Sequence, residues 1–361
     1  MKQHNKITID ASLALINRTG AYYIARDIVD AFSSGNYIRY WRLWNKYPNA
    51  SLVRKFFGRL MLKEIQVLKD SPIFQWPEKE GSDRIIYLDP LYVLRNKLSS
   101  NDIVLCHDIG PITHPELYEH KTIDLYHLAY QKIKHIGPGM VFVSETSKNQ
   151  FMKHFGTNYR LLKTISLYLR SYLQQGDEVP VEGLVPQRYF LSVGVLNRRK
   201  NYINTIKAFA QGEFALQGYQ LVICGPNGDI SDEIKSLAAN TPSVRVMGYV
   251  SDENLRWLYK NAAIFVIPSL FEGFGMPALE AAAFGVPVVV SKDSALADAV
   301  NGLGVQVNQH DFGDIANGIQ KILSMDDQEI YRLKQQLVGY ASTATKANFI
   351  SQWRTLLEDQ S

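Results

Sequence analysis

Cysteine is scarce in this chain of 361 residues: Cys106 and Cys224 are the only two, and each ends a predicted strand in a different half. Two distant cysteines argue against a disulfide framework and fit a reducing compartment. No cluster of Cys and His has zinc-site spacing, and no Asp-x-Asp motif is present to hold a metal-bound diphosphate. We therefore expect two core thiols and no metal.

Long apolar runs, low-complexity segments and short repeats are also missing. The first residues, MKQHNKITIDASLAL, lack the apolar core and cleavage site of a signal peptide, and no stretch is long enough to span a bilayer. With 46% hydrophobic and 20% charged residues, the composition is that of a folded globular protein. We expect a cytoplasmic chain with two domains of about 150 to 200 residues each.

Net charge is small, at +4, but it is unevenly distributed. Residues 1–180 carry 24 Lys and Arg against 17 Asp and Glu, so the first half is the basic one. Its densest patch, RKFFGRLMLK at residues 54–63, interleaves cations and apolar residues at helical spacing. That pattern is typical of helices on anionic membrane surfaces, and equally of ordinary helices with a solvated basic face. No RNA- or DNA-binding module accompanies it, so we do not expect nucleic acid as a partner.

Apolar runs alternate with helical patterns in both halves, which predicts an α/β protein with parallel sheets. The expected strands lie near residues 6–14, 38–44, 84–90, 103–107 and 140–144, and then near 189–195, 220–224, 244–247, 263–267 and 287–290. Residues 174–187 change to Gly, Pro and acids with little periodicity. They predict a linker between a first domain at 1–173 and a second at 188–343.

The most informative stretch is PSLFEGFGMPALEAAAFGVPVVVS at residues 268–291, which predicts a loop, a helix and the strand after it. Glu272 lies in the loop, and Glu280 lies about one turn into the helix. The turn between them allows the backbone to come close to a ligand, and it consists of Gly273, Phe274 and Gly275. Unpaired N–H groups at the start of such a helix favour a phosphate or a sugar hydroxyl.

The same turn also fits the dinucleotide fingerprint GxGxxG/A, running from Gly273 to Ala278, with Asp293 about 20 residues further on. An NAD-dependent oxidoreductase is therefore an alternative. Against it, the fingerprint normally opens the first βαβ unit of its domain, whereas three strand–helix units precede it here after residue 188. The oxidoreductase also leaves Glu272 without a role.

With its two glutamates, GFG turn, following proline and closing GVPVVVS, this stretch resembles the E-x7-E signature of the family 4 glycosyltransferases. The resemblance implies a retaining enzyme of the GT-B architecture, in which two Rossmann-like, doubly wound α/β domains face each other across a cleft. It implies that Glu272 contacts the donor's sugar ring and Glu280 the nucleotide's ribose. It further implies that residues 344–361 form a helix that crosses back to the first domain.

Three more segments of the second half resemble this family. YFLSVGVLNRRKN at residues 189–201 is similar to the element that grips the donor diphosphate, which implies Lys200 first and Arg199 next as its cations. Many relatives carry an arginine where this chain has Val195. VICGPNGD and VRVMGYVSDENLRWLY resemble segments beside the nucleotide base, with Gly248 permitting a tight turn and Tyr249 packing against the base. A purely architectural role for these two segments is an equal alternative.

In the first half, IVLCHDIGP at residues 103–111 predicts a strand that delivers His107 and Asp108 to the cleft. Relatives that transfer mannose often carry such a His-Asp pair. A lone histidine at a strand end is otherwise more often a satisfied core group. The loop NRTG, which ends at Gly20, resembles the family's glycine turn that approaches the leaving diphosphate.

The resemblance therefore implies a metal-independent, cofactor-free hexosyltransferase of cell-surface polysaccharide assembly. The expected donor is a nucleoside diphosphate sugar, with GDP-mannose favoured, and the expected acceptor is a glycan or a polyprenyl-diphosphate-linked oligosaccharide. Lys200 and its neighbours would stabilise charge on the departing diphosphate, and His107 would position the donor sugar or the acceptor. We expect the protein in the cytoplasm, peripheral to the inner face of the plasma membrane. A GT-B sugar-nucleotide epimerase or phosphorylase and an inactive scaffold are the remaining alternatives.

Overall fold

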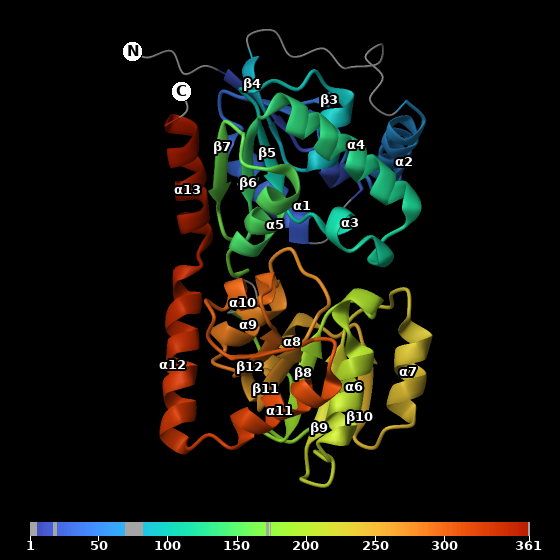
Figure 1. Cartoon of the computed structure of the whole chain (residues 1–361), viewed down its shortest axis with the longest axis vertical. Helices are drawn as coiled ribbons and strands as arrows, with labels where there is room; N and C mark the ends of the chain where they lie inside the picture. The colour runs from blue at the N-terminus through green and yellow to red at the C-terminus, as the bar shows by residue number, and fades with distance from the viewer. Residues whose placement is uncertain (1–5, 17–19, 69–81, 171–172, 174, 360–361) are drawn as a thin grey trace. The chain divides into compact units, whose positions relative to one another are not determined.

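A computed structural model describes residues 6–16, 20–68, 82–170, 173 and 175–359 of the chain. It contains two compact units, each built on one mainly parallel sheet (Figure 1). The first unit comprises Met1–Ser166 together with Phe349–Ser361, and the second comprises Leu167–Asn348. The stretch predicted as a linker falls within the range of the second unit.

The sheet of the first unit has seven strands in the order β3-β2-β1-β4-β5-β6-β7. These are β1 (Lys6–Asp10), β2 (Tyr37–Tyr40), β3 (Leu43–Trp44), β4 (Ser82–Tyr87), β5 (Ile103–Cys106), β6 (Gly139–Phe142) and β7 (Leu161–Thr164). All neighbours pair in parallel except β2 and β3. The strand order reverses direction between β1 and β4. The carboxyl ends of these two strands form the switch point, beyond which ligands bind in such sheets.

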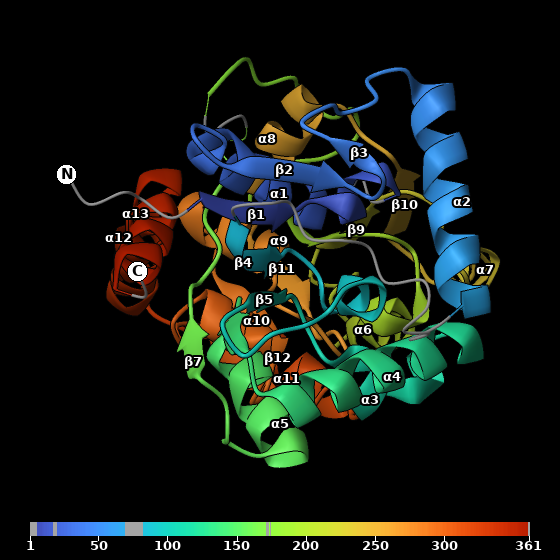
Figure 2. The same ribbon diagram turned by 90° about the horizontal axis from the view of Figure 1, so that it is seen from above.

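The first unit contains the helices between its strands and also the last helix of the chain. They are α1 (Gly20–Phe32), α2 (Ser51–Leu68), α3 (Gly110–Thr113), α4 (His120–Ile136), α5 (Glu145–Phe155) and α13 (Lys346–Glu358), with short 3-10 turns η1 (Ser12–Leu15), η3 (Pro90–Arg95) and η4 (Pro115–Leu117). Seen from above, α2 and α13 lie at opposite margins of the unit (Figure 2). Trp353 of α13 is fully buried, so the last helix contributes to this core.

The single strand predicted at residues 38–44 is in fact a hairpin of β2 and β3. Trp41 between them has a left-handed backbone, with φ of 57°, which ends the extended conformation and turns the chain back on itself. Its backbone N–H donates to Ser12 Oγ at 2.7 Å, and its indole N–H donates to Glu64 at 2.7 Å. The first predicted strand is also shorter than expected, because the chain turns into η1 after Asp10.

The sheet of the second unit has six parallel strands in the order β10-β9-β8-β11-β12-β13. They are β8 (Tyr189–Val193), β9 (Gln220–Cys224), β10 (Val244–Gly248), β11 (Ile264–Ile267), β12 (Val288–Ser291) and β13 (Val305–Val307). The connecting helices are α6 (Tyr202–Gln211), α7 (Ser231–Ala239), α8 (Asp252–Asn261), α9 (Met276–Ala283), α10 (Ala295–Ala299), α11 (Phe312–Leu323) and α12 (Asp327–Thr343), with the 3-10 turn η6 (Arg198–Lys200). Numbered along this unit, the strand order is 3-2-1-4-5-6, that of the Rossmann fold.

Both faces of this second sheet are covered, as the apolar strands require. One face packs Phe190, Ile264 and Val266 against α6, α7 and α11 in a continuous core. On the opposite face, the ring of Phe265 lies 5.7 Å from that of Tyr259 in α8, and α9 and α10 pack on β12. The predicted doubly wound α/β fold is confirmed.

Two strands have no counterpart in the sequence prediction. β7 and β13 are edge strands of four and three residues, and β7 is only half-buried, so neither shows a long apolar run. Among the described residues, no helix combines the length and hydropathy needed to cross a bilayer.

Candidate functional site

The second unit gathers its charged candidates where its strand order reverses. β8 and β11 are the adjacent strands at this point, and they pair in parallel through Ile264 and Phe190. The loop after β8 carries Arg199 and Lys200, and the loop after β11 carries Glu272. Because ligands bind beyond the carboxyl ends of such strands, the fold itself brings these three residues to a binding position.

Asparagines hold the loop after β8 in shape. The side chain of Asn197 caps η6 by accepting from the backbone N–H of Lys200 at 3.1 Å. Asn201 adopts the left-handed conformation, with φ of 61°, and its side-chain amide donates to the carbonyls of Pro268 at 2.8 Å and Gln309 at 2.7 Å. Asparagine tolerates this conformation better than most residues, so it ties the two loops together while starting α6.

Glu272 is the centre of a buried ion cluster. Its Oε1 atom lies 2.6 Å from Lys200 Nζ and accepts from Ser269 Oγ at 3.0 Å, while Oε2 lies 2.5 Å from Arg199 Nη1. Burial alone would raise the pKa of this carboxyl, but the positive charges of Arg199 and Lys200 outweigh it and lower the pKa of Glu272 to about 2. Glu272 is therefore ionised at neutral pH.

The two cations of the cluster differ in access. The Lys200 side chain is 7% exposed, whereas that of Arg199 is 29% exposed. The aliphatic part of Lys200 crosses Gly194, where an added Cβ would lie only 2.8 Å from Lys200 Cε. Gly194 has φ of 151°, so both its backbone and its missing side chain are needed for lysine to reach Glu272.

Glu280 is buried in α9 and has two partners of its own. Oε1 accepts from Arg170 Nη2 at 2.5 Å and Nε at 3.1 Å, and Oε2 accepts from the Tyr259 hydroxyl at 3.0 Å. Arg170 and Tyr259 were absent from the sequence prediction. No local signal identifies them, because they precede Glu280 by 110 and 21 positions. Burial and the nearby Glu280 charge raise the pKa of Tyr259 well above its usual value, so this phenol remains a donor.

The glycine-rich turn between the glutamates has a packing role in the structure. Gly275 caps α9 with φ of 108°, and a Cβ there would come within 2.7 Å of the Leu296 side chain. Phe274 is buried, whereas Gly273 is half-buried. Packing against Leu296 in α10 is enough to require glycine at position 275. A close approach of the backbone to a ligand remains a prediction for Gly273.

The predicted base-side segment follows β9 and β10. Gly248 ends β10 with φ of 68°, and its carbonyl accepts from the N–H of Gly225 at 2.8 Å. The Tyr249 side chain next to it is 79% exposed. At Gly225 an added Cβ would lie 1.9 Å from the Gly194 carbonyl oxygen. The loops after β8 and β9 therefore contact each other through their backbones. Tyr249 is free to pack against a flat ligand, and its role stays a prediction.

His107 and Asp108 follow β5 in the first unit. His107 Nε2 lies 3.1 Å from the carbonyl oxygen of Leu88, which only accepts, so Nε2 carries the proton. Burial lowers the pKa of His107, although this bond and Asp108 oppose the effect, and the ring is neutral at neutral pH. Asp108 Oδ1 accepts from the N–H of Gly110 at 2.8 Å, which orders the turn into α3.

A further acid, after the strand next to that of His107, was not predicted from the sequence. Asp89 follows β4 and accepts from the N–H of Leu91 at 2.9 Å and from the Tyr126 hydroxyl at 3.2 Å. Burial raises its pKa to about 7, because it outweighs these two hydrogen bonds and is assisted by repulsion from Asp108. The first unit thus holds a neutral imidazole and a weakly acidic carboxyl at the ends of adjacent strands.

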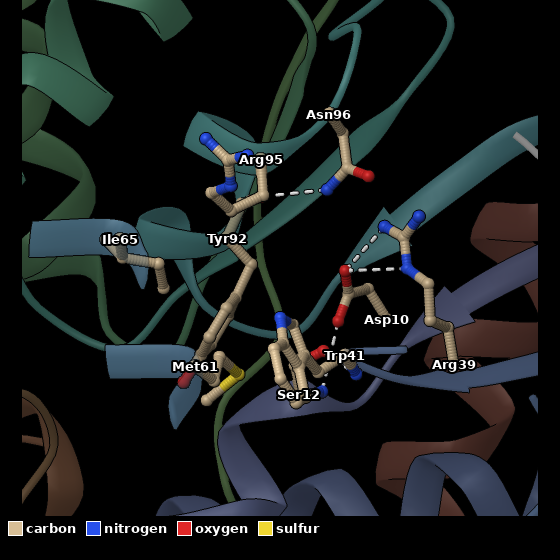
Figure 3. Close-up of a pocket in the computed structure, with 9 residues that line it drawn as sticks. All are labelled: Asp10, Ser12, Arg39, Trp41, Met61, Ile65, Tyr92, Arg95 and Asn96. Carbon is tan, nitrogen blue, oxygen red and sulfur yellow. Dashed lines mark hydrogen bonds and ion pairs between the residues drawn. The ribbon is translucent and has the colours of Figure 1, made fainter. Parts of the chain in front are cut away.

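The switch point of the first unit also carries a closed ion pair. Asp10, at the end of β1, lies 2.6 Å from Arg39 Nη2, and both side chains are buried. They border a small pocket (Figure 3), lined by Asp10, Ser12, Arg39, Trp41, Met61, Ile65, Tyr92, Arg95 and Asn96. Asp10 also accepts from the backbone N–H of Ser12 at 3.0 Å, so this pair orders the chain after β1.

Gly20 begins α1 and is exposed. Residues 17–19 of the predicted glycine turn lie outside the described residues. A Cβ added to Gly20 would meet no atom within 4 Å, so nothing in the described part of the first unit requires glycine here. Across the described part of the chain, no group of three or more His, Cys, Asp or Glu is arranged to hold a metal ion.

Comparisons with known proteins find similarity to glycosyltransferases. Residues 177–341 match the family model described as glycosyl transferases group 1. O-antigen chain mannosyltransferase B of Escherichia coli is 27% identical over 263 residues, covering 70% of this chain and 68% of that protein. Two further curated glycosyltransferases match over 36% and 63% of their own lengths.

Solved structures are similar over the whole chain. Sucrose-phosphate synthase from Thermosynechococcus elongatus superposes with a TM-score of 0.71 at 18% identity, covering 98% of both chains. Anabaena Alr3699/HepE, solved in complex with UDP and glucose, gives 0.69 at 16% identity, covering 99% of this chain and all of that one. At these identities the likeness shows the fold.

Proposed function

Because the chain is a glycosyltransferase of GT-B fold that resembles bacterial O-antigen mannosyltransferases, we propose that it transfers a hexose from a nucleoside diphosphate sugar with retention of configuration. The proposed acceptor is a glycan or a polyprenyl-diphosphate-linked oligosaccharide of a cell-surface polysaccharide. One observation carries this proposal: Lys200 and Arg199 converge on Glu272 at the switch point of the second unit. The comparisons do not support the NAD-dependent oxidoreductase.

The charge of the cluster suits a diphosphate. Two cations surround one ionised carboxylate, which leaves one positive charge in excess beside the start of α9. Arg199, the more exposed cation, would meet the phosphates first, and Lys200 would then share its charge between Glu272 and the ligand. As the glycosidic bond breaks, negative charge grows on the diphosphate, and fixed cations stabilise that charge more than they stabilise the ground state.

The carboxylates would bind hydroxyls. An ionised carboxylate accepts several hydrogen bonds, and Glu272 keeps acceptor capacity beyond its bonds to Lys200, Arg199 and Ser269. We assign it to the donor's sugar ring. Glu280 is assigned to the ribose, and a ribose hydroxyl there would compete with Arg170 for Oε1.

His107 is assigned to the sugar side of the reaction. As a neutral ring with its proton on Nε2, it offers Nδ1 as an acceptor for a hydroxyl of the donor or the acceptor. We do not assign it as a nucleophile. In a same-face mechanism the departing phosphate oxygen takes the acceptor's proton, so retention does not by itself require a side chain as base.

We favour GDP-mannose as the donor, because the curated relatives that cover most of this chain are named mannosyltransferases. A UDP-sugar is the second candidate, since a structural neighbour was solved with UDP and glucose. We further propose that the enzyme works in the cytoplasm at the inner face of the plasma membrane. The excess of 24 cations over 17 acids in residues 1–180 supports contact with anionic lipid.

Calorimetric titration with GDP, UDP and NAD tests the proposal directly. We expect one of the two diphosphates to bind to the wild-type protein and to lose affinity in Lys200→Ala. Lys235→Ala, which removes an exposed lysine from α7, is the matched control and should bind like the wild type. Preferential binding of NAD would contradict the proposal.

Turnover then separates a transferase from a GT-B epimerase. A panel of nucleotide sugars is incubated with and without a mannose-containing acceptor. A transferase extends the acceptor and releases the nucleoside diphosphate, whereas an epimerase converts the donor sugar with no acceptor present. Conversion of the sugar alone would assign the epimerase.

A further inference from the structure

Helix α2 presents two different faces. The inner face packs on the first unit through Met61 and Ile65, which are fully buried. Arg54 also lies inward, where its Nη1 atom donates to the carbonyl of Leu15 at 3.2 Å. At Gly58 an added Cβ would lie 2.8 Å from the Leu15 carbonyl oxygen, so the helix is seated closely against η1. Arg54, counted with the basic face in the sequence prediction, does not belong to it.

The outer face of α2 is apolar over much of its length. Its large hydrophobic side chains are between 39% and 83% exposed, and they are Leu52, Val53, Phe56, Leu60 and Val67. Leu52, Phe56 and Leu60 recur every four residues, which aligns them along one side of the helix. Exposed apolar residues are ordinary when scattered singly, but five on one helix face form a patch that marks an interaction site.

Cations border this apolar stripe. Lys55, Arg59 and Lys63 are exposed and also recur every four residues, so they form a parallel row beside it. The single acid of the helix, Glu64, is turned away from this face, because its carboxylate bonds to Trp41 at 2.7 Å and to Arg95 at 3.3 Å. The outer face of α2 therefore carries three positive charges and no negative one from the helix itself.

We propose that this outer face of α2, from Leu52 to Val67, docks on an anionic lipid bilayer with the helix lying along the surface. The apolar side chains enter the region between headgroups and acyl chains, while the cations meet anionic headgroups. Figures 1 and 2 place α2 at the margin of the first unit. Charge complementarity identifies the occupant, since apolar and cationic stripes together match lipid.

Other occupants fit this face less well. A second copy of the chain pairing through the same face would bring Lys55, Arg59 and Lys63 close to their own counterparts, and like charges repel. Nucleic acid would use the cations but leave the stripe of Leu52, Phe56 and Leu60 in water. The proposal rests on the membrane contact proposed above, but it does not depend on glycosyl transfer or on the identity of the donor.

Vesicle flotation of the full-length protein, without donor or acceptor, tests the proposal. Vesicles of phosphatidylcholine alone are compared with vesicles containing 30% phosphatidylglycerol, a composition chosen as the probe. Each cation near an anionic surface is worth about fivefold in binding, so Lys55→Gln/Arg59→Gln/Lys63→Gln should weaken binding to the anionic vesicles by about a hundredfold. Raising the salt concentration should weaken binding of the wild type in the same direction.

A matched control separates this face from general charge. Lys153→Gln/Lys235→Gln/Lys321→Gln removes three exposed lysines from other helices and should retain binding. A second variant, Leu52→Ser/Phe56→Ser/Leu60→Ser, changes only exposed side chains. It should bind weakly to both kinds of vesicle while keeping the melting temperature of the wild type, because these residues contribute little to the core.

Three results would overturn the proposal. The control triple variant could lose as much binding as the α2 triple variant, or the wild type could bind neither vesicle. Analytical ultracentrifugation could instead show a dimer that the serine variant dissociates, which would assign the face to a second copy. Transfer to a soluble acceptor, measured in the same variants, should be unchanged, so failure of lipid binding and failure of catalysis are read separately.

Discussion

The two units share the strand order 3-2-1-4-5-6, which the first unit extends by β7. They nevertheless carry different charges at the point where that order reverses. In the second unit, Arg199 and Lys200 outnumber the carboxylate of Glu272. In the first unit, Arg39 is matched by Asp10, and the groups beyond this pair are the neutral His107 and the weakly acidic Asp89. An anion is attracted to the excess positive charge of the second unit. It gains no such attraction from the side chains at the switch point of the first unit.

This difference supports the proposed division of labour between the units. The topology fixes where a ligand can bind, and the side chains on the strand-end loops decide which charge it carries. The excess positive charge of the second unit suits a diphosphate, whereas the neutral His107 and weakly acidic Asp89 of the first unit suit uncharged hydroxyls. The buried ion pairs also differ in kind: Asp10 with Arg39 orders the chain after β1, whereas the pair of Lys200 with Glu272 has Arg199 beside it, accessible to solvent.

The largest expected effect tests whether the pair in the first unit is structural. Asp10→Asn leaves Arg39 buried without its counter-charge and should lower the free energy of unfolding by about 3 to 5 kcal/mol. Nucleotide affinity, measured by calorimetry where the variant is folded, should stay at the wild-type value. Asp30→Asn breaks the exposed pair with Arg26 and, as the control, should cost less than about 1 kcal/mol. A loss of nucleotide binding in folded Asp10→Asn would contradict the division of labour.

Lys200→Ala tests the proposed catalytic role of the ion cluster in the second unit. Removing one preorganised donor from a developing oxyanion costs about a hundredfold to a thousandfold in kcat. We therefore expect kcat to fall by that amount with the melting temperature changed little, because Arg199 still neutralises Glu272. Lys235→Ala, the exposed control, should keep full turnover. Full activity in Lys200→Ala would remove the diphosphate assignment.

The acid sensitivity of the second unit should follow from Glu272. Its pKa is about 2 in the folded chain against an ordinary value near 4.5, so the folded state binds fewer protons than the unfolded state. The resulting stabilisation, about 3 kcal/mol, is complete above pH 4.5 and is lost as the pH falls towards 2. Urea unfolding followed by circular dichroism at several pH values measures this loss.

Glu272→Gln is the variant that identifies the source of this dependence. It should flatten the part of the stability curve between pH 4.5 and 2, and at pH 7 it should already be less stable, because Lys200 and Arg199 then face each other without a counter-charge. Glu233→Gln, on the exposed side of α7, should leave the curve as it is. If the free energy of unfolding of Glu272→Gln still fell between pH 4.5 and 2 as in the wild type, another group would be responsible for the acid sensitivity.

A smaller effect distinguishes the two glutamates of the second unit. Glu280→Gln keeps the size of the side chain and its bond to the Tyr259 hydroxyl but loses the charge that we propose binds the ribose hydroxyls. A hydrogen bond to a charged group contributes about 1.5 to 3 kcal/mol, so nucleotide affinity should fall by roughly ten- to a hundredfold. Calorimetry with the nucleoside diphosphate measures this fall. Equal affinity in wild type and variant would exclude the ribose assignment.

Local patterns were sufficient for much of the second unit. Its apolar runs predicted a parallel sheet and the positions of β8 to β12, and the family resemblance implied the Rossmann-like architecture and the loop positions of Lys200 and Glu272. Contacts between distant residues were not predictable in this way. Nothing near Glu280 in the sequence indicates Arg170, which reaches it from 110 positions away.

In the first unit, local patterns misled where tertiary packing overrode them. The run at 38–44 predicts one strand, but Trp41 finds partners in Ser12 and Glu64 that favour a turn. Asp89 attracts no attention in the sequence, because its raised pKa comes from burial beside Asp108 after folding. Charge counting placed Arg54 on the outer face of α2, whereas the helix rotation that packs Met61 and Ile65 turns it inward.

Gly20→Ala is the mildest change, and it asks whether the first unit approaches the diphosphate through its backbone. A Cβ at this position meets no atom within 4 Å and adds little strain at the start of α1, so the free energy of unfolding should change by less than about 0.5 kcal/mol. Only a bound ligand would then sense the methyl group, and we expect about a tenfold loss of kcat/KM for donor. Gly35→Ala is unsuitable as a control because φ there is 80°, whereas Gly339→Ala meets open space within α12 and should keep both stability and turnover. If Gly20→Ala retained full kcat/KM, Gly20 would serve only as the first residue of α1. The first unit would then make no backbone contact with the diphosphate at this position.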